Sequence, residues 1–191
     1  GEGTLITTES VLLNANRNPG LSKAEIEALF ARLLGVTRTI WLPGDPDRVT
    51  GDMTDGHVDG VCAFARPGAL LLDATRDTTS AYAEVVRENR RALELALDAR
   101  DRRFELIELF DAGEVAPEDG VFCASYTNFY IANGAIIMPA YGVAADDAAA
   151  ATLARAFPAR EVVPVRIDHL AHGGGGVHCI TQQQPAWPAR R

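Results

Sequence analysis

Short β-branched and apolar segments alternate with helical segments in a recurring order, and this order limits the folds that the chain can adopt. One strand–helix–strand unit is followed by two strand–strand–helix–strand units. The predicted strands are 4–13, 36–43, a pair within 57–74 around the turn RPG, 104–110, a pair within 121–142 turned at NG, and 160–167; the predicted helices are 21–35, 79–99 and 145–157. Because hairpins recur between the helices, the pattern indicates an α/β or α+β fold built from a repeated module rather than one doubly wound sheet.

The helix predicted over 21–35 has the clearest boundaries. Ser22 can cap its first turn, and Glu25 follows three residues later, as in a capping box. Gly35 can end the helix, because glycine adopts the left-handed conformation that commonly closes one. Local chemistry therefore defines both ends of this segment.

Charge and composition exclude several classes of partner. The chain has 191 residues, of which 47% are hydrophobic and 23% charged, and its formal net charge is −8. No nucleic acid is expected as a partner because phosphate contacts require clustered Lys and Arg, whereas an acidic field favours a cationic small molecule. No apolar run reaches membrane-spanning length, so no membrane partner is expected. The three widely spaced cysteines favour a reducing, cytoplasmic compartment over a disulfide framework.

The segment GGGGVHCITQQQP (173–185) places a thiol directly after the most flexible part of the chain. Glycines let the backbone approach a ligand closely, and a nearby cation or dipole makes a thiol nucleophilic. Cys179 is therefore a candidate nucleophile, with a buried, inert cysteine as the alternative. Its neighbour His178 would face the other way in a strand and is not assigned as a base. Cys62 and Cys123 lie in apolar runs and are predicted to belong to the core.

Two further motifs carry polar side chains at a spacing of two. In TDGHVD, an extended backbone would direct His57 and Asp59 to the same face, which suits proton transfer near neutral pH; the same pattern also occurs on ordinary surfaces. In SYTNFYIANG, alternation would place Tyr126, Asn128 and Tyr130 on one face. Hairpin packing is the favoured interpretation of this face, and a pocket wall is the alternative. Neither motif is specific by itself.

No metal site is expected. His169, His172 and His178 include an HxxH spacing, but they lack the additional carboxylate and the helix that make such a motif persuasive. The chain also has no CxxC pair.

A cysteine, a histidine and an aspartate in an acidic chain fit two reaction types. One is hydrolysis of an acyl bond by a Cys–His pair. The other is attack on the carbon of a guanidinium group, which is flat, permanently charged and rich in donors. Such a substrate requires carboxylates in its plane, a nucleophile above that plane, and a histidine that protonates the leaving ammonia and then activates water.

Four separated stretches narrow this choice. The chain resembles the agmatine deiminase family, also called bacterial-type peptidylarginine deiminases, over nearly its whole length and in order, in EGTLITTESVLLNANRNPGLSKAEIE, TDGHVD, SYTNFYIANGAIIMPAYG and GGGGVHCITQQQP. This family belongs to the guanidine-modifying superfamily. The resemblance implies a five-bladed, pseudo-symmetric α/β propeller of strand–strand–helix–strand modules, and no metal or organic cofactor.

The resemblance also implies roles for individual residues. Cys179 would attack the guanidinium carbon, expel ammonia and form a covalent thiouronium. His57 would be the general acid and base, and Asp59 would bind the guanidinium nitrogens. Water would then release N-carbamoylputrescine if the substrate is agmatine, a step of putrescine biosynthesis.

Gly174, Gly175 and Asn128 are expected to complete the substrate site around the cysteine. Gly60 and Gly176 stand where the family more often has Asn. The substrate beyond the guanidinium group therefore stays open, and peptidyl-arginine or another guanidine compound is the alternative to agmatine.

Residues 1–191 are expected to form the C-terminal portion, about three blades, of a single deiminase propeller domain. Two acidic residues of the family pattern precede the point where this sequence begins, so the N-terminal portion of the same protein is an expected partner and the isolated chain is expected to be inactive. A homodimer is a further expectation, since an open propeller edge favours association. The alternatives are an inactive half-propeller that serves as an interaction module and, less favoured, a papain-like hydrolase, whose cysteine typically lies near the mature N-terminus.

Overall fold

The structure is a computed structural model that describes residues 2–46, 53–115 and 121–184. Its strands are β1 Thr4–Thr8, β2 Arg38–Leu42, β3 Cys62–Arg66, β4 Ala69–Ala74, β5 Glu105–Phe110, β6 Tyr130–Ala132, β7 Ala135–Ala140 and β8 Glu161–Arg166. Its helices are α1 Glu9–Leu12, α2 Lys23–Leu34, α3 Ala81–Leu95, α4 Ala144–Ala156 and α5 Asp168–Ala171, with 3₁₀ turns η1 Val58–Gly60, η2 Gly113–Val115 and η3 His178–Ile180. Within these segments no helix is long and apolar enough to cross a membrane.

The strands of the described residues form three separate sheets with a repeated topology. In the first sheet, β1 and β2 are parallel. In the second, β3 is antiparallel to β4, and β4 is parallel to β5. The third sheet repeats this arrangement with β6, β7 and β8. Helices α2, α3 and α4 connect the parallel pairs, so the predicted order of modules and the mixed α/β class are confirmed.

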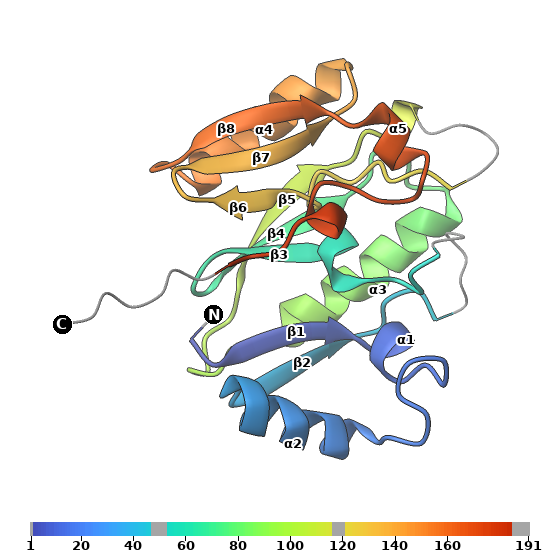
Figure 1. The fold of residues 1–191 in the computed structure, drawn as a ribbon, viewed down its shortest axis with the longest axis vertical. Coiled ribbons are helices and arrows are strands. Elements are labelled where there is room, and N and C mark those ends of the chain that lie inside the picture. Colours follow the sequence, from blue (N-terminus) through green and yellow to red (C-terminus); the bar gives the residue numbers. More distant parts are fainter. Residues whose placement is uncertain (1, 47–52, 116–120, 185–191) are drawn as a thin grey trace.

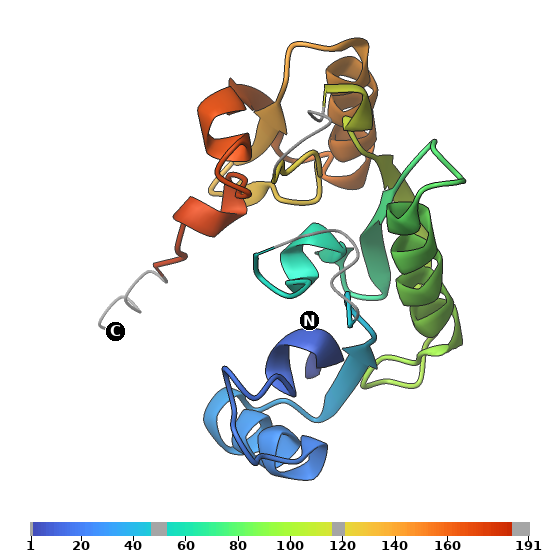
Figure 2. The same cartoon turned by 90° about the vertical axis from the view of Figure 1, so that its right-hand side faces the viewer.

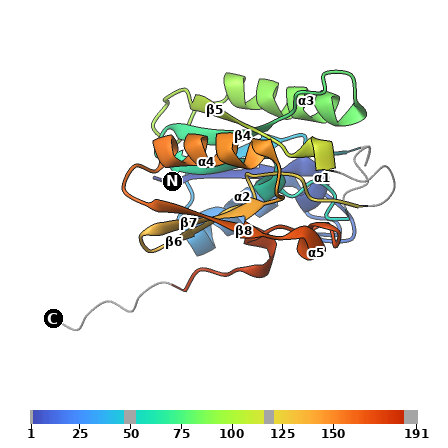
Figure 3. The ribbon, with the colours of Figure 1, turned by 90° about the horizontal axis from the view of Figure 1, so that it is seen from above.

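The three modules follow one another along an arc. Figure 1 shows the sheets one above another, from β1–β2 to β6–β7–β8. Turned by 90°, the view shows helices α2, α3 and α4 on the outer side of the arc and the teal segment near residue 60 on its inner side (Figure 2). From above, α5 and the red segment that follows it, up to residue 184, lie on the opposite side of β8 from α4 (Figure 3).

Strand β4 lies between the two hydrophobic clusters of the core. All six of its residues are buried. Because neighbouring side chains of a strand point to opposite faces, Leu70 and Leu72 pack in the cluster shared with β2 and α3, whereas Leu71 packs in the cluster shared with β7 and α4. The apolar run Ala69–Leu72 is typical of a strand that is covered on both faces.

The predicted boundaries of α2 are confirmed. Ser22 and Glu25 form the reciprocal capping box, and Gly35 closes the helix in the left-handed conformation with φ of 67°. These groups are close in sequence, which explains why the sequence alone predicted them.

Two predicted strands are wrong in part. The segment 4–13 is a strand only as far as Thr8, because its partner β2 ends opposite that residue at Leu42; the following residues form α1 instead. The segment 121–142 is a strand pair only from Tyr130 onward. Before that point the backbone pairs with segments distant in sequence, as when the Cys123 amide donates to the carbonyl of Ala171 at the end of α5.

The first and second modules are joined by a buried side-chain amide. Asn89 on α3 is fully buried, its Oδ1 accepts a hydrogen bond from the Gly44 amide at 2.9 Å, and its Nδ2 donates to the Gly44 carbonyl at 2.9 Å. The same Nδ2 also donates to the Val85 carbonyl within α3. The loop after β2 therefore depends on this one side chain for both of its buried backbone bonds at Gly44.

Substitution Asn89→Ala should lower the free energy of unfolding by about 2–4 kcal/mol, because it leaves the buried amide and carbonyl of Gly44 without partners. Urea unfolding followed by circular dichroism measures this change. The control is Glu88→Ala, an exposed position on the same helix, which should change the stability by no more than about 0.5 kcal/mol. Equal effects of the two substitutions would contradict this account of Asn89.

Candidate functional site

A cavity of about 1020 Å³ brings most of the predicted site residues together. It is lined by residues from the loops around the second and third sheets, including His57, Asp59, Asn128, Gly174 and Cys179. Gly175 is not among the lining residues; a side-chain carbon placed on it would lie 3.5 Å from the Cβ of Cys179. The fold therefore brings together predicted site residues that are far apart in the sequence.

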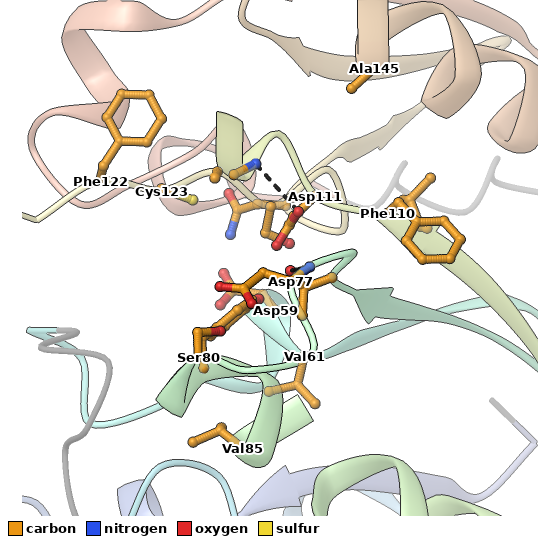
Figure 4. Close-up of a pocket in the computed structure, with 18 of the residues that line it drawn as sticks. Asp59, Val61, Asp77, Ser80, Val85, Phe110, Asp111, Phe122, Cys123 and Ala145 are labelled. Carbon is orange, nitrogen blue, oxygen red and sulfur yellow. Dashed lines mark hydrogen bonds between the residues drawn. The ribbon is translucent and has the colours of Figure 1, made fainter. Parts of the chain in front are cut away.

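Carboxylates from several loops face this cavity. Asp59, Asp77, Asp111 and Glu114 are among its lining residues, and Figure 4 shows the first three with Cys123 nearby. Burial raises the pKa of Asp111, whereas the backbone and hydroxyl of Thr79 lower the pKa of Asp77. At neutral pH the cavity is therefore acidic and favours a cationic ligand.

The carboxylate of Asp59 pairs with the ring of His178. Asp59 Oδ2 lies 2.8 Å from His178 Nδ1. Burial raises the pKa of Asp59, but hydrogen bonding and charge from His178, the charge of His57 and a hydrogen bond from Asn128 outweigh it, so this pKa is lowered. The bond to Asp59 raises the pKa of His178, against the opposing effect of burial. The pair therefore favours the ionised carboxylate and the protonated imidazole.

The thiol of Cys179 lies beside this pair. Its Sγ is 3.8 Å from Asp59 Oδ2 and 3.5 Å from Asn128 Oδ1, and the residue is exposed. Exposure at a cavity excludes the alternative that Cys179 is a buried, inert cysteine. The expectation that His178 faces away from it is wrong, because η3 is a 3₁₀ turn and not a strand, so neighbouring side chains do not alternate.

His57 lies in the same cavity but not in the hydrogen-bonded cluster. Its backbone amide donates to Thr54 Oγ1 at 3.2 Å, and it immediately precedes η1, so HVDGV is not extended. Among the described residues, the hydrogen bonds of the Cys179 thiol run to Asp59 and Asn128 rather than to the His57 ring. Its role as general acid and base therefore stays a prediction.

The glycine loop packs closely against the segment that precedes β6. Gly174 has φ of +76°, and a Cβ on it would lie 2.7 Å from Val121 Cγ1. A Cβ on Gly176 would lie 2.3 Å from Asn128 Oδ1. The missing side chains thus permit close approach between two protein segments, and they bring Cys179 against Asn128.

The other cysteines differ from each other. Cys62 is buried in β3, as predicted, and burial raises its pKa to about 12. Cys123 is only half-buried and lines the cavity, although burial is still the main cause that raises its pKa to about 12. Its assignment to the core is therefore wrong in part, because residues near it are irregular and not strand.

Tyr126 and Asn128 do not share one face of a strand, so the alternative of a pocket wall built by alternation is not formed. Tyr126 is fully buried, and its hydroxyl donates to Asp146 Oδ1 at 2.7 Å, whereas Asn128 lines the cavity. Both lie outside a strand, so alternation does not apply. No group of three or more His, Cys, Asp or Glu side chains in the described segments is arranged to hold a metal ion.

A buried polar network beneath the cavity was missed by sequence analysis. Asp73 accepts hydrogen bonds from the hydroxyls of Tyr82 and Ser125. Ser125 Oγ lies 2.6 Å from Thr127 Oγ1, which donates to the Asp59 carbonyl at 3.1 Å. Burial is the main cause that raises the pKa of Asp73 to about 7. The available signal was an aspartate inside the apolar run ALLLDA.

Substitution Asp59→Asn should lower the pKa of His178, because it removes the charge and the hydrogen bond that raise this pKa and leaves the opposing effect of burial. Titration of the imidazole by nuclear magnetic resonance measures the shift. Asp77→Asn removes another carboxylate of the cavity and serves as the control, for which the pKa of His178 should not change. An unchanged pKa in Asp59→Asn would refute the pairing.

The sequence of this chain matches a known protein family and several known proteins. The sequence profile of the Porphyromonas-type peptidyl-arginine deiminase family matches residues 1–185. The agmatine deiminase of Medicago truncatula is 45% identical over an alignment of 210 positions, gaps included, which covers 97% of this chain and 54% of that protein. The chain thus spans about half the length of the curated relatives that it matches.

Solved structures agree with this match. The agmatine deiminase of Enterococcus faecalis superimposes with a TM-score of 0.86 at 32% identity, covering 96% of this chain and 54% of the other. The C. jejuni agmatine deiminase with substrate bound gives a TM-score of 0.82 at 27% identity, covering 93% and 51%. The family profile and the matching folds lead to one conclusion: this chain belongs to the Porphyromonas-type peptidyl-arginine deiminase family and is similar to proteins named agmatine deiminase.

Proposed function

We propose that this chain carries the reacting groups of an agmatine deiminase, which hydrolyses agmatine to N-carbamoylputrescine and ammonia. The observation that supports this most directly is the meeting of the exposed Cys179 thiol with the Asp59 carboxylate in an acidic cavity. Relatives named agmatine deiminase, at 40–45% identity, support the choice of substrate. The activity of the whole protein is part of the proposal, because the chain spans about half of those relatives.

In the first half of the proposed reaction, the Cys179 thiolate attacks the guanidinium carbon. The carbon–nitrogen bond to one terminal nitrogen breaks, His57 supplies the proton, and ammonia leaves. A covalent thiouronium remains on the sulfur. Asp59 suits the binding of guanidinium nitrogens because its lowered pKa keeps it ionised at neutral pH.

In the second half, His57 takes a proton from water, and the resulting hydroxide attacks the thiouronium carbon. Collapse of the resulting tetrahedral intermediate breaks the carbon–sulfur bond, releases the ureido product N-carbamoylputrescine and restores the thiolate. The second proton, which the intermediate loses from nitrogen or oxygen, passes through solvent to the released ammonia. The overall change is agmatine plus water to N-carbamoylputrescine plus ammonia. Backbone of Gly174 and Gly175 is proposed to line the path of the substrate, with Gly174 at the cavity wall.

Deimination of peptidyl-arginine is the second candidate function. Two observations favour it: the matching family is described as peptidyl-arginine deiminases, and Cys179 is exposed rather than enclosed. A third possibility, an interaction module without activity, becomes the conclusion if neither substrate reacts.

The architecture beyond the described sheets is also a proposal. We propose that the three sheets are blades of a five-bladed propeller and that the remaining blades complete the cavity. We also propose that the protein is cytoplasmic and that it forms a homodimer. The repeated strand–strand–helix–strand topology and the arc of the modules in Figure 2 support the propeller.

Agmatine should release ammonia with the natural protein, and Cys179→Ala should lower this rate by at least about 10⁴-fold, because the nucleophile is removed. Rapid acid quenching followed by peptide mass spectrometry should find the amidine adduct on the peptide that contains Cys179. The peptide that contains Cys123 is the internal control and should carry no adduct.

Two comparisons separate the candidates. Faster turnover of an arginine-containing peptide than of agmatine would favour the second function, and no turnover of either by folded protein would favour the interaction module. Assays of the 191-residue polypeptide in parallel test the expectation that it is inactive alone. Full activity of that polypeptide would contradict this expectation.

A further inference from the structure

The side-chain oxygen of Asn128 holds the segment that carries the candidate nucleophile. Asn128 is 2% exposed. Its Oδ1 accepts hydrogen bonds from the backbone amides of His178 at 2.9 Å and Cys179 at 3.4 Å. The main-chain carbonyl of Asn128 also accepts from the His178 amide at 3.1 Å. These bonds satisfy amides at the start of η3, which otherwise have no partner within the turn.

Asp59 lies close to the same carboxamide, because its Oδ2 is 3.8 Å from Cys179 Sγ, which itself lies 3.5 Å from Asn128 Oδ1. A hydrogen bond from the Asn128 side chain contributes, after the larger effects of burial and His178, to the pKa of Asp59 and lowers it. Because the oxygen accepts from two backbone amides, the NH₂ group is the end that remains to donate to the carboxylate. One planar group thus bridges the backbone of Cys179 and the carboxylate of Asp59.

Close packing restricts the movement of this bridge. The Gly176 position has no side chain, and a Cβ there would fall 2.3 Å from Oδ1 and 2.8 Å from Cβ of Asn128. On the other flank, the neighbouring Thr127 donates to the Asp59 carbonyl. The carboxamide is therefore enclosed by the two segments that it joins.

We propose that Asn128 is a positioning residue, which sets the separation between the Cys179 thiol and the Asp59 carboxylate through this bridge. This role deepens the proposed function and rests on Cys179 being its nucleophile. It differs from direct contact with the substrate, which the sequence predicts for Asn128, because the buried oxygen is already occupied by backbone amides.

Two substitutions separate the two ends of the bridge. Asn128→Asp keeps an oxygen for the backbone amides, removes the donor to Asp59 and adds a negative charge beside the thiol. Asn128→Ala removes both bonds and adds no charge. The matched controls are Asn133→Asp and Asn133→Ala, which make the same changes in the exposed β6–β7 turn of the same module.

The readouts do not depend on turnover. Alkylation of Cys179 by neutral iodoacetamide at pH 7, followed by peptide mass spectrometry, should slow about tenfold in Asn128→Asp, because a nearby carboxylate disfavours the thiolate. The pKa of His178, followed by nuclear magnetic resonance, should rise further in the same variant. In Asn128→Ala, the amides of His178 and Cys179 should exchange hydrogen about tenfold faster. Both Asn133 variants should match the wild type.

Each outcome has a defined meaning. Wild-type alkylation, His178 titration and amide exchange in both Asn128 variants would overturn the proposal. If the natural protein turns over agmatine, Asn128→Ala should lower kcat by on the order of 100-fold with little change in KM. A raised KM with normal alkylation would instead assign Asn128 to substrate contact, and it would also overturn the proposal. If the readouts change as expected but agmatine does not react, the bridge stands and the proposed function fails. Asn128→Asp is nearly isosteric, so it still tests the bridge if Asn128→Ala does not fold.

Discussion

The pairing of Asp59 with His178 is the contact on which the rest of the cavity depends. It joins side chains 119 residues apart, one before β3 and one after α5, and places the Cys179 thiol beside them. The contribution of Asp59 to stability is present at neutral pH and is lost as the pH falls through its lowered pKa, whereas that of His178 is lost as the pH rises through its raised pKa. The pair is therefore most stabilising between these two limits, where both groups are charged.

Much of the architecture could be predicted from the sequence because its signals are local. The capping residues of α2, the turns between paired strands and the apolar runs of β4 and β7 each specify structure within a few positions. Their order along the chain was enough to predict the repeated module. The failures occurred at Thr8 and before Tyr130, where the length of a partner strand or contacts with segments distant in sequence decide the backbone conformation.

The sequence predicted which residues meet at the candidate site, but it did not predict how their side chains are arranged. Motif resemblance selected Asp59, Asn128 and Cys179, which the structure brings into contact. It did not predict that His178 binds Asp59, because the orientation of His178 follows from the 3₁₀ turn η3. The His178 amide of this turn is hydrogen-bonded to the backbone and side chain of Asn128, 50 residues away, and no local sequence pattern predicts such a contact.

The network beneath the cavity has a consequence for the location of a proton. Three links run from Asp73 to Ser125, from Ser125 to Thr127, and from Thr127 to the Asp59 carbonyl. Each hydroxyl has a single hydrogen to donate, so Ser125 and Thr127 can supply only two of these three bonds. While Asp73 is ionised and accepts from Ser125, no hydrogen is left for the contact between Ser125 and Thr127. All three bonds form at once only while Asp73 keeps its own proton and donates it to Ser125, which its pKa of about 7 permits in neutral solution. Loss of that proton breaks one link of the chain that ends at the backbone of Asp59, so an acid buried in the sheet is coupled to the loop that carries the site.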